Sequence, residues 1–314
     1  MHALANIARP TSRISAYPDH AMTTRPPDLP LTFPRGPIAA HLGRVCSLIT
    51  LLLVAGCSTY GPARPGEKIY RDVQFAAPGG HRLYMDLYVP KTTQPAPVVL
   101  WIFGGCWRFG SKGYHVNVRD LTAAGIAVAS IQYRMSSTAV YPAQLEDCHA
   151  ATQWLRDHGA EYGIDATRMG ASGESSGGQL AAMLGATEGK SRIRAVCALY
   201  PVSDVTDLAR RYAKPGRLGL IEKLLGGPIE QKLELAASAS PIEHISPALP
   251  PTLIIHGARD RTIPVGQSEQ YFLALAAAHV EAQLMVAPDK GHWFRLDDVQ
   301  FAEVSRFFQT HLSR

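Results

Sequence analysis

Between residues 97 and 287 the sequence alternates short β-rich runs with longer segments of helical periodicity. Several of these runs are apolar at nearly every position, which is typical of strands that helices cover on both faces. Strands that alternate with helices form mostly parallel sheets, because each helix returns the chain to the end where the next strand starts. The alternation therefore predicts an α/β protein, with strands at 97–103, 126–133, 168–173, 193–200, 251–257 and 281–287.

Two further runs precede this region and flank a Pro-Gly turn, which predicts an antiparallel hairpin of 69–76 with 81–90. Helices are predicted at 143–162, 176–187, 266–279 and 299–312, where apolar residues recur at helical spacing. An antiparallel hairpin followed by six parallel strands gives eight in all, with helices on both faces. This is the layout of the α/β-hydrolase fold. Residues 204–248 interrupt the alternation with charges, glycines and prolines, and we interpret them as a small lid.

Residues 1–56 differ from this domain. Their first part is rich in proline and arginine without apolar periodicity, which predicts disorder. Arg44 then precedes the mostly apolar run 45–54 and two small residues, the pattern of a secretory signal. The apolar run is too short to span a bilayer as a helix.

The stretch "VAGC" at 54–57 resembles the lipobox of bacterial lipoproteins. The resemblance implies that Cys57 becomes the acylated first residue of the mature protein, with 57–69 as a tether and 70–314 as the folded domain. It also implies a lipid anchor in the bacterial cell envelope, and Ser58 implies the outer membrane. A plain cleaved signal peptide, giving a periplasmic or secreted protein, and an N-terminal hydrophobic anchor remain alternatives.

The formal charge of +5 is concentrated in the leader, where five arginines face two aspartates, so the domain carries only about +2. This gives no electrostatic reason to expect a nucleic-acid partner. The domain has three cysteines, Cys106, Cys148 and Cys197. An odd number leaves at least one thiol unpaired, and the spacing fits no metal site.

The stretch "GESSGG" at 173–178 lies where a predicted strand meets a predicted helix. It matches the G-x-S-x-G nucleophile elbow, in which a serine occupies a strained turn at the edge of the sheet. Gly173 and Gly177 are small, so strand and helix can approach each other. We predict Ser175 as the nucleophile, with the backbone N–H of Ser176 facing an oxyanion.

A serine hydroxyl needs a base, and the chain order in this fold is Ser, then Asp or Glu, then His. Asp260 follows the strand 251–257, and His292 follows the strand 281–287. We predict that His292 takes the proton of Ser175 and that Asp260 orients His292. His256 lies on a predicted strand, and we expect it to point into packing.

The oxyanion loop is expected after the strand 97–103, where the sequence reads "WIFGGCWRFGSK". It resembles the HGGGW loop of the bacterial carboxylesterases related to hormone-sensitive lipase and feruloyl esterases. The resemblance implies that Gly105 and Cys106 donate N–H groups to the oxyanion together with Ser176. Two residues depart from the family: Phe103 replaces the histidine and Cys106 replaces the third glycine.

The resemblance extends over about 70–312 and is closest at 141–178 and 246–260. It implies a serine carboxylic-ester hydrolase that acts on small to medium esters through an acyl-enzyme. Only a short tether precedes the first strand, which favours the smaller feruloyl- and acetyl-esterase-like relatives.

Two alternatives share this fold: a serine peptidase of the acyl-peptide or prolyl type, and a non-catalytic, membrane-tethered binding protein. Four aromatic residues either line the substrate pocket or pack in the core: Trp107, Tyr133, Tyr200 and Trp293. We expect no cofactor and no metal, because Glu174 and Asp204 lack further ligands nearby. The oligomeric state has no signature in the sequence.

Overall fold

The computed structural model describes residues 13–15, 63–113, 117–186, 192–212 and 219–313. The predicted signal segment, Cys57 and most of the predicted leader lie outside these residues. Among the described residues, no helix is both long enough and apolar enough to cross a membrane.

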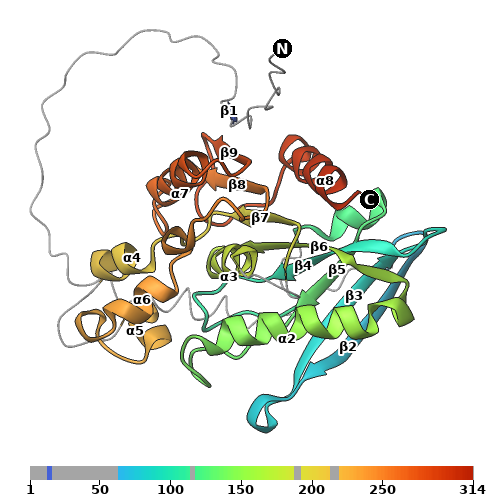
Figure 1. The fold of residues 1–314 in the computed structure, drawn as a ribbon, viewed down its shortest axis with the longest axis horizontal. Coiled ribbons are helices and arrows are strands. Elements are labelled where there is room, and N and C mark those ends of the chain that lie inside the picture. Colours follow the sequence, from blue (N-terminus) through green and yellow to red (C-terminus); the bar gives the residue numbers. More distant parts are fainter. Residues whose placement is uncertain (1–12, 16–62, 114–116, 187–191, 213–218, 314) are drawn as a thin grey trace, which may run out of the picture. The chain divides into compact units, whose positions relative to one another are not determined.

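A nine-stranded sheet forms the centre of the domain, in the order β1-β9-β8-β7-β6-β4-β5-β3-β2 (Figure 1). The eight predicted strands are all present, as β2 (Glu67–Ala76), β3 (Leu83–Pro90), β4 (Ala96–Ile102), β5 (Ala127–Ile131), β6 (Ile164–Glu174), β7 (Ala195–Leu199), β8 (Thr252–Gly257) and β9 (Ala282–Ala287). β2 and β3 form the antiparallel hairpin, and β3 pairs antiparallel with β5. The strands from β4 to β9 run parallel, as predicted.

The ninth strand, β1 (Arg13–Ser15), lies in the stretch that we predicted to be disordered, and for these residues the prediction was wrong. β1 pairs in parallel with β9, with Arg13 opposite Gln283. Pairing at an open sheet edge uses backbone N–H and C=O groups and so needs no apolar pattern in the added segment. Periodicity alone therefore gives no sign of such a strand.

The predicted helices are present as α2 (Ala143–His158), α3 (Ser176–Gly185), α7 (Gly266–Ala277) and α8 (Asp298–Leu312). The first is shorter than predicted, because the chain tightens into the 3₁₀ turn η4 (Gly159–Tyr162). Gly163 follows with φ 75°, a left-handed conformation that ends helices and favours glycine. β6 starts directly after this turn.

Helices cover both faces of the sheet, which explains why the strands are apolar on both sides (Figure 1). Along β4, Val98 and Leu100 belong to the core cluster beneath α2 and α3. Val99 and Trp101 point to the opposite face and pack in the cluster that contains Phe308 of α8. α7 packs against β8 and β9.

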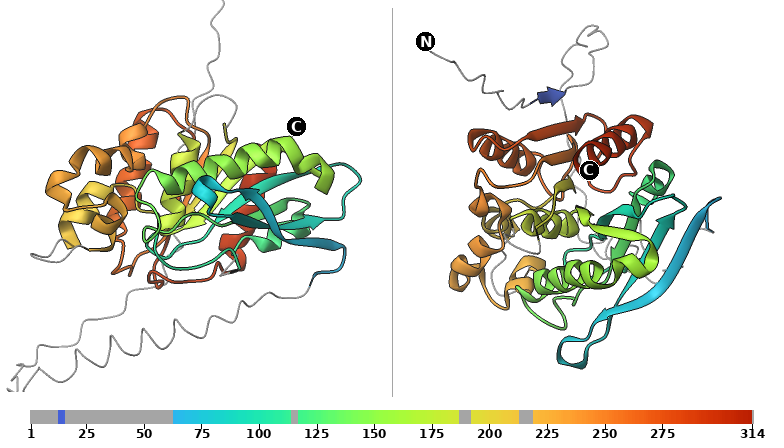
Figure 2. Two further views of the ribbon diagram at one scale, coloured as in Figure 1. Left: turned by 90° about the horizontal axis from the view of Figure 1, so that it is seen from below. Right: turned by 45° about the vertical axis from the view of Figure 1, so that its right-hand side comes forward.

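The predicted lid segment, 204–248, contains α4 (Val205–Tyr212), α5 (Leu220–Leu225), η6 (Ile229–Gln231), α6 (Leu233–Ser238) and η7 (Pro241–His244). Figures 1 and 2 show α4, α5 and α6 side by side at one end of the domain. Buried apolar residues of α4 and α5, among them Leu208 and Leu224, join the same core cluster as the sheet. The segment is therefore packed onto the domain.

Candidate active site

Ser175 lies at the sharp turn between β6 and α3. Its backbone has φ 55° and ψ −120°, a conformation that a residue with a side chain rarely adopts. The Ser175 N–H donates to the Leu199 carbonyl (2.9 Å), and the Ser175 carbonyl accepts from the Gln179 N–H (3.1 Å). These bonds hold the turn from both sides. Ser175 is only 3% exposed, and it lies at the carboxyl end of the sheet.

The glycines around Ser175 are required by close backbone contacts. A Cβ atom on Gly177 would lie 2.1 Å from the Ile102 carbonyl oxygen, and one on Gly173 would lie 2.3 Å from the Gly177 carbonyl oxygen. Neither site has room for a side chain, because carbon and oxygen cannot approach so closely. The steric reason for the predicted G-x-S-x-G turn is thus visible in the backbone of β4, β6 and α3.

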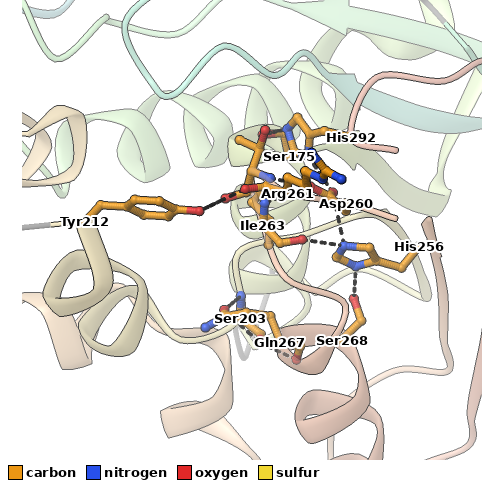
Figure 3. A network of polar contacts seen from close by, with 11 residues as sticks. Ser175, Ser203, Tyr212, His256, Asp260, Arg261, Ile263, Gln267, Ser268 and His292 are labelled. Carbon is orange, nitrogen blue, oxygen red and sulfur yellow. Dashed lines mark hydrogen bonds and ion pairs between the residues drawn. The ribbon is translucent and has the colours of Figure 1, made fainter. Parts of the chain in front are cut away.

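The structure brings together the three side chains predicted as a triad, Ser175, Asp260 and His292 (Figure 3). His292 Nε2 lies 3.0 Å from Ser175 Oγ. His292 Nδ1 lies 2.7 Å from Asp260 Oδ2. With Nδ1–H donating to the carboxylate, Nε2 is left as an acceptor for the serine hydroxyl. The arrangement can therefore withdraw a proton from Ser175.

Two loops that follow neighbouring strands carry Asp260 and His292. The Arg259 N–H donates to the Lys290 carbonyl at 2.9 Å. A Cβ atom on Gly257 would lie 2.5 Å from both the Lys290 and Gly291 carbonyl oxygens. Only glycine at the end of β8 lets the loop after β9 approach so closely. This contact brings His292 within reach of Asp260.

Asp260 is held as a carboxylate by four donors. Its Oδ1 accepts the backbone N–H groups of Thr262 and Ile263, each at 2.8 Å. Its Oδ2 lies near His292 and also 3.2 Å from Nε2 of His256. Burial alone would raise the pKa of Asp260, but the hydrogen bonds from His256 and His292 outweigh it and hold that pKa well below its usual range.

His256 is the residue that sequence reasoning missed. It lies on β8 and is fully buried, as expected, but its ring makes polar contacts (Figure 3). Nε2 lies 2.9 Å from the Ile263 carbonyl, and Nδ1 lies 2.7 Å from Ser268 Oγ on α7. Nε2 faces two acceptors, Ile263 O and Asp260 Oδ2, so it carries the proton. The available signal was the spacing in "HGARD", which places His256 four residues before Asp260.

The loop after β4 lies beside the nucleophile turn. Cys106 and Trp107 both have φ 56°, and the Trp107 N–H donates to Ser176 Oγ at 3.3 Å. Among the described residues, the N–H groups of Gly105, Cys106 and Ser176 have no protein acceptor. These are the three predicted oxyanion donors.

Phe103, which replaces the family's histidine, braces this loop through apolar contacts. Its ring stacks on Tyr133 with centroids 4.6 Å apart, and the Tyr133 hydroxyl donates to the Phe103 carbonyl at 3.1 Å. A Cβ atom on Gly110 would lie 2.6 Å from the Phe103 ring. The ring therefore packs under the loop in a place where the resemblance implies a polar bracing residue.

Glu174, directly before the nucleophile, is fully buried. The Tyr200 hydroxyl donates to its Oε2 at 2.8 Å, and Asn117 Nδ2 donates to the same atom at 3.2 Å. Burial raises the pKa of Glu174 to about 7, although these hydrogen bonds and one from the Gly104 backbone oppose the shift. No group of three potential metal-ligating side chains occurs in the described part of the chain.

A cavity of about 550 Å³ adjoins Ser175. Its walls come from the oxyanion loop, the nucleophile turn, α4, α5 and the loop after Asp260. The Tyr212 hydroxyl, at the end of α4, donates to the carbonyl oxygens of Arg261 (3.1 Å) and Thr262 (3.0 Å). The first part of the predicted lid is thus fastened to the loop that carries Asp260.

Of the four aromatic residues considered for this pocket, only Trp107 lines the cavity. Its indole Nε1–H donates to Gln179 Oε1 at 2.9 Å. Tyr200 and Trp293 contact the His292 ring edge-on instead, each with centroids 5.0 Å apart. Cys106, Cys148 and Cys197 are all free thiols.

Comparison with known proteins agrees with this geometry. Residues 85–275, more than half of the chain, match the model of the BD-FAE family. The chain is 32% identical to Esterase LipC and 31% identical to the probable carboxylic ester hydrolase LipM, both of Mycobacterium tuberculosis. These matches cover 66% and 68% of this chain but 55% and 54% of the relatives. The chain thus spans about half the length of the curated relatives it matches.

Among solved structures, a truncated carbohydrate esterase from gut microbiota superposes with a TM-score of 0.73 at 27% identity. The match covers 81% of this chain and all of the other. A thermophilic esterase from Thermogutta terrifontis superposes with a TM-score of 0.61 at 24% identity over 79% of this chain and 91% of its own, and this likeness concerns the fold. The chain has the α/β-hydrolase fold and belongs to the BD-FAE family.

Proposed function

We propose that this protein is a serine carboxylic-ester hydrolase that acts through an acyl-enzyme. The observation that carries the proposal is the continuous hydrogen-bonded chain from Ser175 through His292 to Asp260, located at the wall of an apolar cavity. The names of the relatives, esterases and a carboxylic ester hydrolase, support the same class of reaction.

In the first half-reaction, Ser175 Oγ attacks the ester carbonyl carbon while His292 Nε2 accepts the serine proton. The resulting oxyanion accepts hydrogen bonds from the N–H groups of Gly105, Cys106 and Ser176. The tetrahedral intermediate then collapses, the C–O bond to the alcohol breaks, and His292 returns the proton to the departing oxygen. Water repeats the sequence on the acyl-enzyme and releases the acid and free Ser175.

Asp260 orients His292 and stabilises its positive charge, and His256 supports Asp260. Asp260 fixes the tautomer with Nδ1–H and stabilises the imidazolium that forms during attack. His256 Nε2–H donates to Asp260 Oδ2, the oxygen that His292 also contacts, and to the Ile263 carbonyl. It therefore helps to fix the position of Asp260. We therefore assign His256 as a positioning residue that does not touch the substrate.

The cavity sets the class of substrate. A volume of about 550 Å³ with mainly apolar walls suits the acyl or alcohol group of a small to medium ester. Cys106, which stands where the family has a glycine, lines this cavity. The donors on the oxyanion loop are backbone groups, so the substitution leaves their chemistry intact.

The proposal is tested by hydrolysis of 4-nitrophenyl acetate, butyrate and decanoate. Ser175→Ala is expected to lower turnover on the order of 10⁶-fold, because the serine and histidine act as one unit. Ser176→Ala keeps the backbone N–H and removes the hydroxyl that accepts the Trp107 N–H, so turnover is expected to fall by about tenfold or less. Equal loss in both variants contradicts the assignment of Ser175.

The same assay separates the alternatives. Cleavage of an aminoacyl-peptide substrate in preference to every ester indicates a peptidase. A folded protein that turns over neither class indicates a binding protein of the same fold.

We also propose that Cys57 carries a lipid and anchors the domain in the bacterial cell envelope, at the periplasmic face of the outer membrane. The sequence motif at 54–57 supports this proposal. A lipid-anchored esterase would meet substrates within reach of its tether.

A further inference from the structure

The cavity beside Ser175 contains three charged residues in a wall that is otherwise mainly apolar. They are Arg261 on the loop after Asp260, and Glu222 and Lys223 on α5. Val202, Leu208 and Ile263 are among the apolar lining residues. Arg261 is exposed and Lys223 is half-buried, whereas Glu222 is buried. A charged group in such a wall is stabilised by a partner in the protein, by water or by a bound ligand of opposite charge.

Glu222 is already satisfied within the protein. Its Oε2 accepts the Gly219 N–H at 2.7 Å, and its Oε1 accepts the Ile229 N–H at 3.2 Å. It thereby caps the start of α5 and is buried, with 6% exposure. Both carboxylate oxygens of Glu222 already accept backbone N–H groups, so we assign Glu222 to the structure of the lid and not to ligand binding.

Arg261 and Lys223 differ from Glu222 in this respect. Within the described ranges, neither side chain has an acidic partner or a hydrogen bond to a protein acceptor. Two arginines elsewhere in the domain are paired: Arg134 with Asp147 at 2.8 Å, and Arg119 with Glu67 at 2.6 Å. Among the described residues, these two cations of the cavity have no protein counterion.

The backbone of Arg261 is held in place relative to the nucleophile. Its carbonyl accepts from the Tyr212 hydroxyl, and the next two N–H groups donate to Asp260 Oδ1. Asp260 in turn contacts His292, which contacts Ser175. The backbone of Arg261 is thus fixed at the cavity wall, and a series of hydrogen bonds connects it to Ser175.

We propose that Arg261, assisted by Lys223, forms a subsite for an anion, and that the preferred substrates are esters carrying a carboxylate at the far end of an apolar acyl or alcohol group. The inference rests on the proposed esterase function and names its substrate class. The apolar walls take the carbon chain, and the guanidinium binds the carboxylate with two parallel N–H donors.

Physical chemistry gives this subsite a measurable signature. A charge pair bordered by apolar walls is stronger than one in open water, but it weakens as salt screens it. An anionic ester should therefore react faster than a neutral ester of equal length, and the advantage should shrink at high ionic strength. A purely apolar pocket predicts the opposite order, because burial of a carboxylate without a partner is unfavourable.

The kinetic test compares matched pairs of esters. For a charge on the acyl side, the 4-nitrophenyl monoester of glutaric acid is compared with 4-nitrophenyl pentanoate. For a charge on the alcohol side, butyryloxyacetate is compared with ethyl butyrate. We expect kcat/KM for the anionic member of at least one pair to exceed that of its neutral partner by about tenfold at low salt.

Arg261→Gln is expected to remove this advantage while leaving the neutral ester within a few-fold, and Lys223→Gln to reduce it less. Arg259→Gln is the matched control, because Arg259 is exposed like Arg261 and lies on the same loop but does not line the cavity. Loss of the anion advantage in Arg261→Gln but not in Arg259→Gln supports the subsite. A parent enzyme without any anion preference, or a preference that survives Arg261→Gln combined with Lys223→Gln, overturns it.

A binding measurement separates this inference from the esterase proposal. Calorimetry with Ser175→Ala compares monomethyl glutarate with methyl pentanoate, and needs no turnover. Tighter binding of the anion that disappears with Arg261→Gln supports the subsite even where no ester is hydrolysed. Hydrolysis of neutral esters without Arg261-dependent anion binding leaves the esterase function standing and refutes the subsite.

Discussion

Glu174 is a buried carboxyl whose protonation couples the stability of the domain to pH. Its pKa in the folded protein is about 7, raised from 4.5 chiefly by burial. Between these values the folded state holds a proton that the unfolded state has lost, so this group makes the domain less stable as pH rises from about 4.5 to about 7. The shift corresponds to roughly 3 kcal/mol.

Glu174→Gln is therefore expected to remove the part of the decrease in unfolding free energy that Glu174 causes between pH 4.5 and about pH 7. The amide has nearly the same shape and can accept the hydrogen bonds of Tyr200 and Asn117 without burying a charge. Urea unfolding at pH 5 and pH 8 should show a smaller decrease in unfolding free energy for the variant than for the parent. Glu269→Gln, at an exposed site on α7, is the control. The same decrease in Glu174→Gln and the parent contradicts the assigned pKa.

Single residues also mark the limit of what the sequence could predict. The positions of Ser175, Asp260 and His292 after strand ends follow from chain order, since parallel strands end at one edge of the sheet. The role of His256 does not follow in this way. Its ring contacts the Ile263 carbonyl on the loop after β8 and Ser268 on α7. The sequence gives no sign that this loop and this helix pack against the His256 ring.

At the scale of elements, the contact between β4 and α3 determines whether the nucleophile turn can form. Gly177→Ala would place a methyl group 2.1 Å from the Ile102 carbonyl oxygen and 2.5 Å from that of Phe103. Strand and helix must then separate, so we expect the unfolding free energy to fall by about 3 kcal/mol or more and turnover to be lost.

Gly266→Ala is the matched control for this substitution. Gly266 likewise lies in the first turn of a helix, α7, but a Cβ atom there would have no neighbour within 4 Å. Alanine at this site should be neutral or stabilising by up to about 1 kcal/mol, because it restricts the unfolded chain. Thermal unfolding of both variants measures the difference, and similar melting temperatures would show that the close contact is absent.

The elements themselves were largely predictable, because strands covered on both faces are apolar throughout. The boundaries of the elements were harder to predict where a strand begins with polar residues. β6 starts at Ile164, ahead of the predicted 168, and Asp165 there accepts from Thr167 Oγ1 (2.6 Å) and Arg168 Nε (2.7 Å). Local side-chain bonds of this kind satisfy a polar strand start that periodicity cannot distinguish from a loop.

At the scale of the whole molecule, the active site and the predicted anchor are separate parts of the chain. Every residue assigned to the site lies at or beyond Gly105, whereas the lipobox-like motif ends at Cys57. About ten residues separate Cys57 from the start of β2, a length that spans at most about 35 Å when extended. A lipid on Cys57 would therefore keep the domain close to the membrane.

This separation gives the last prediction. When the full chain is expressed in a bacterium, the mature protein should begin at Cys57, incorporate a labelled fatty acid and sediment with the membranes. Cys57→Ala should abolish the incorporation of the labelled fatty acid, because the lipid attaches through the Cys57 sulfur. The added mass of the lipid should disappear as well. Turnover of a soluble ester by the detergent-extracted parent and by residues 58–314 should agree, since every described residue that lines the cavity lies at or beyond Cys106. A mature protein that retains residues before Cys57, or one that sediments without a lipid, contradicts the anchor and leaves the esterase assignment unaffected.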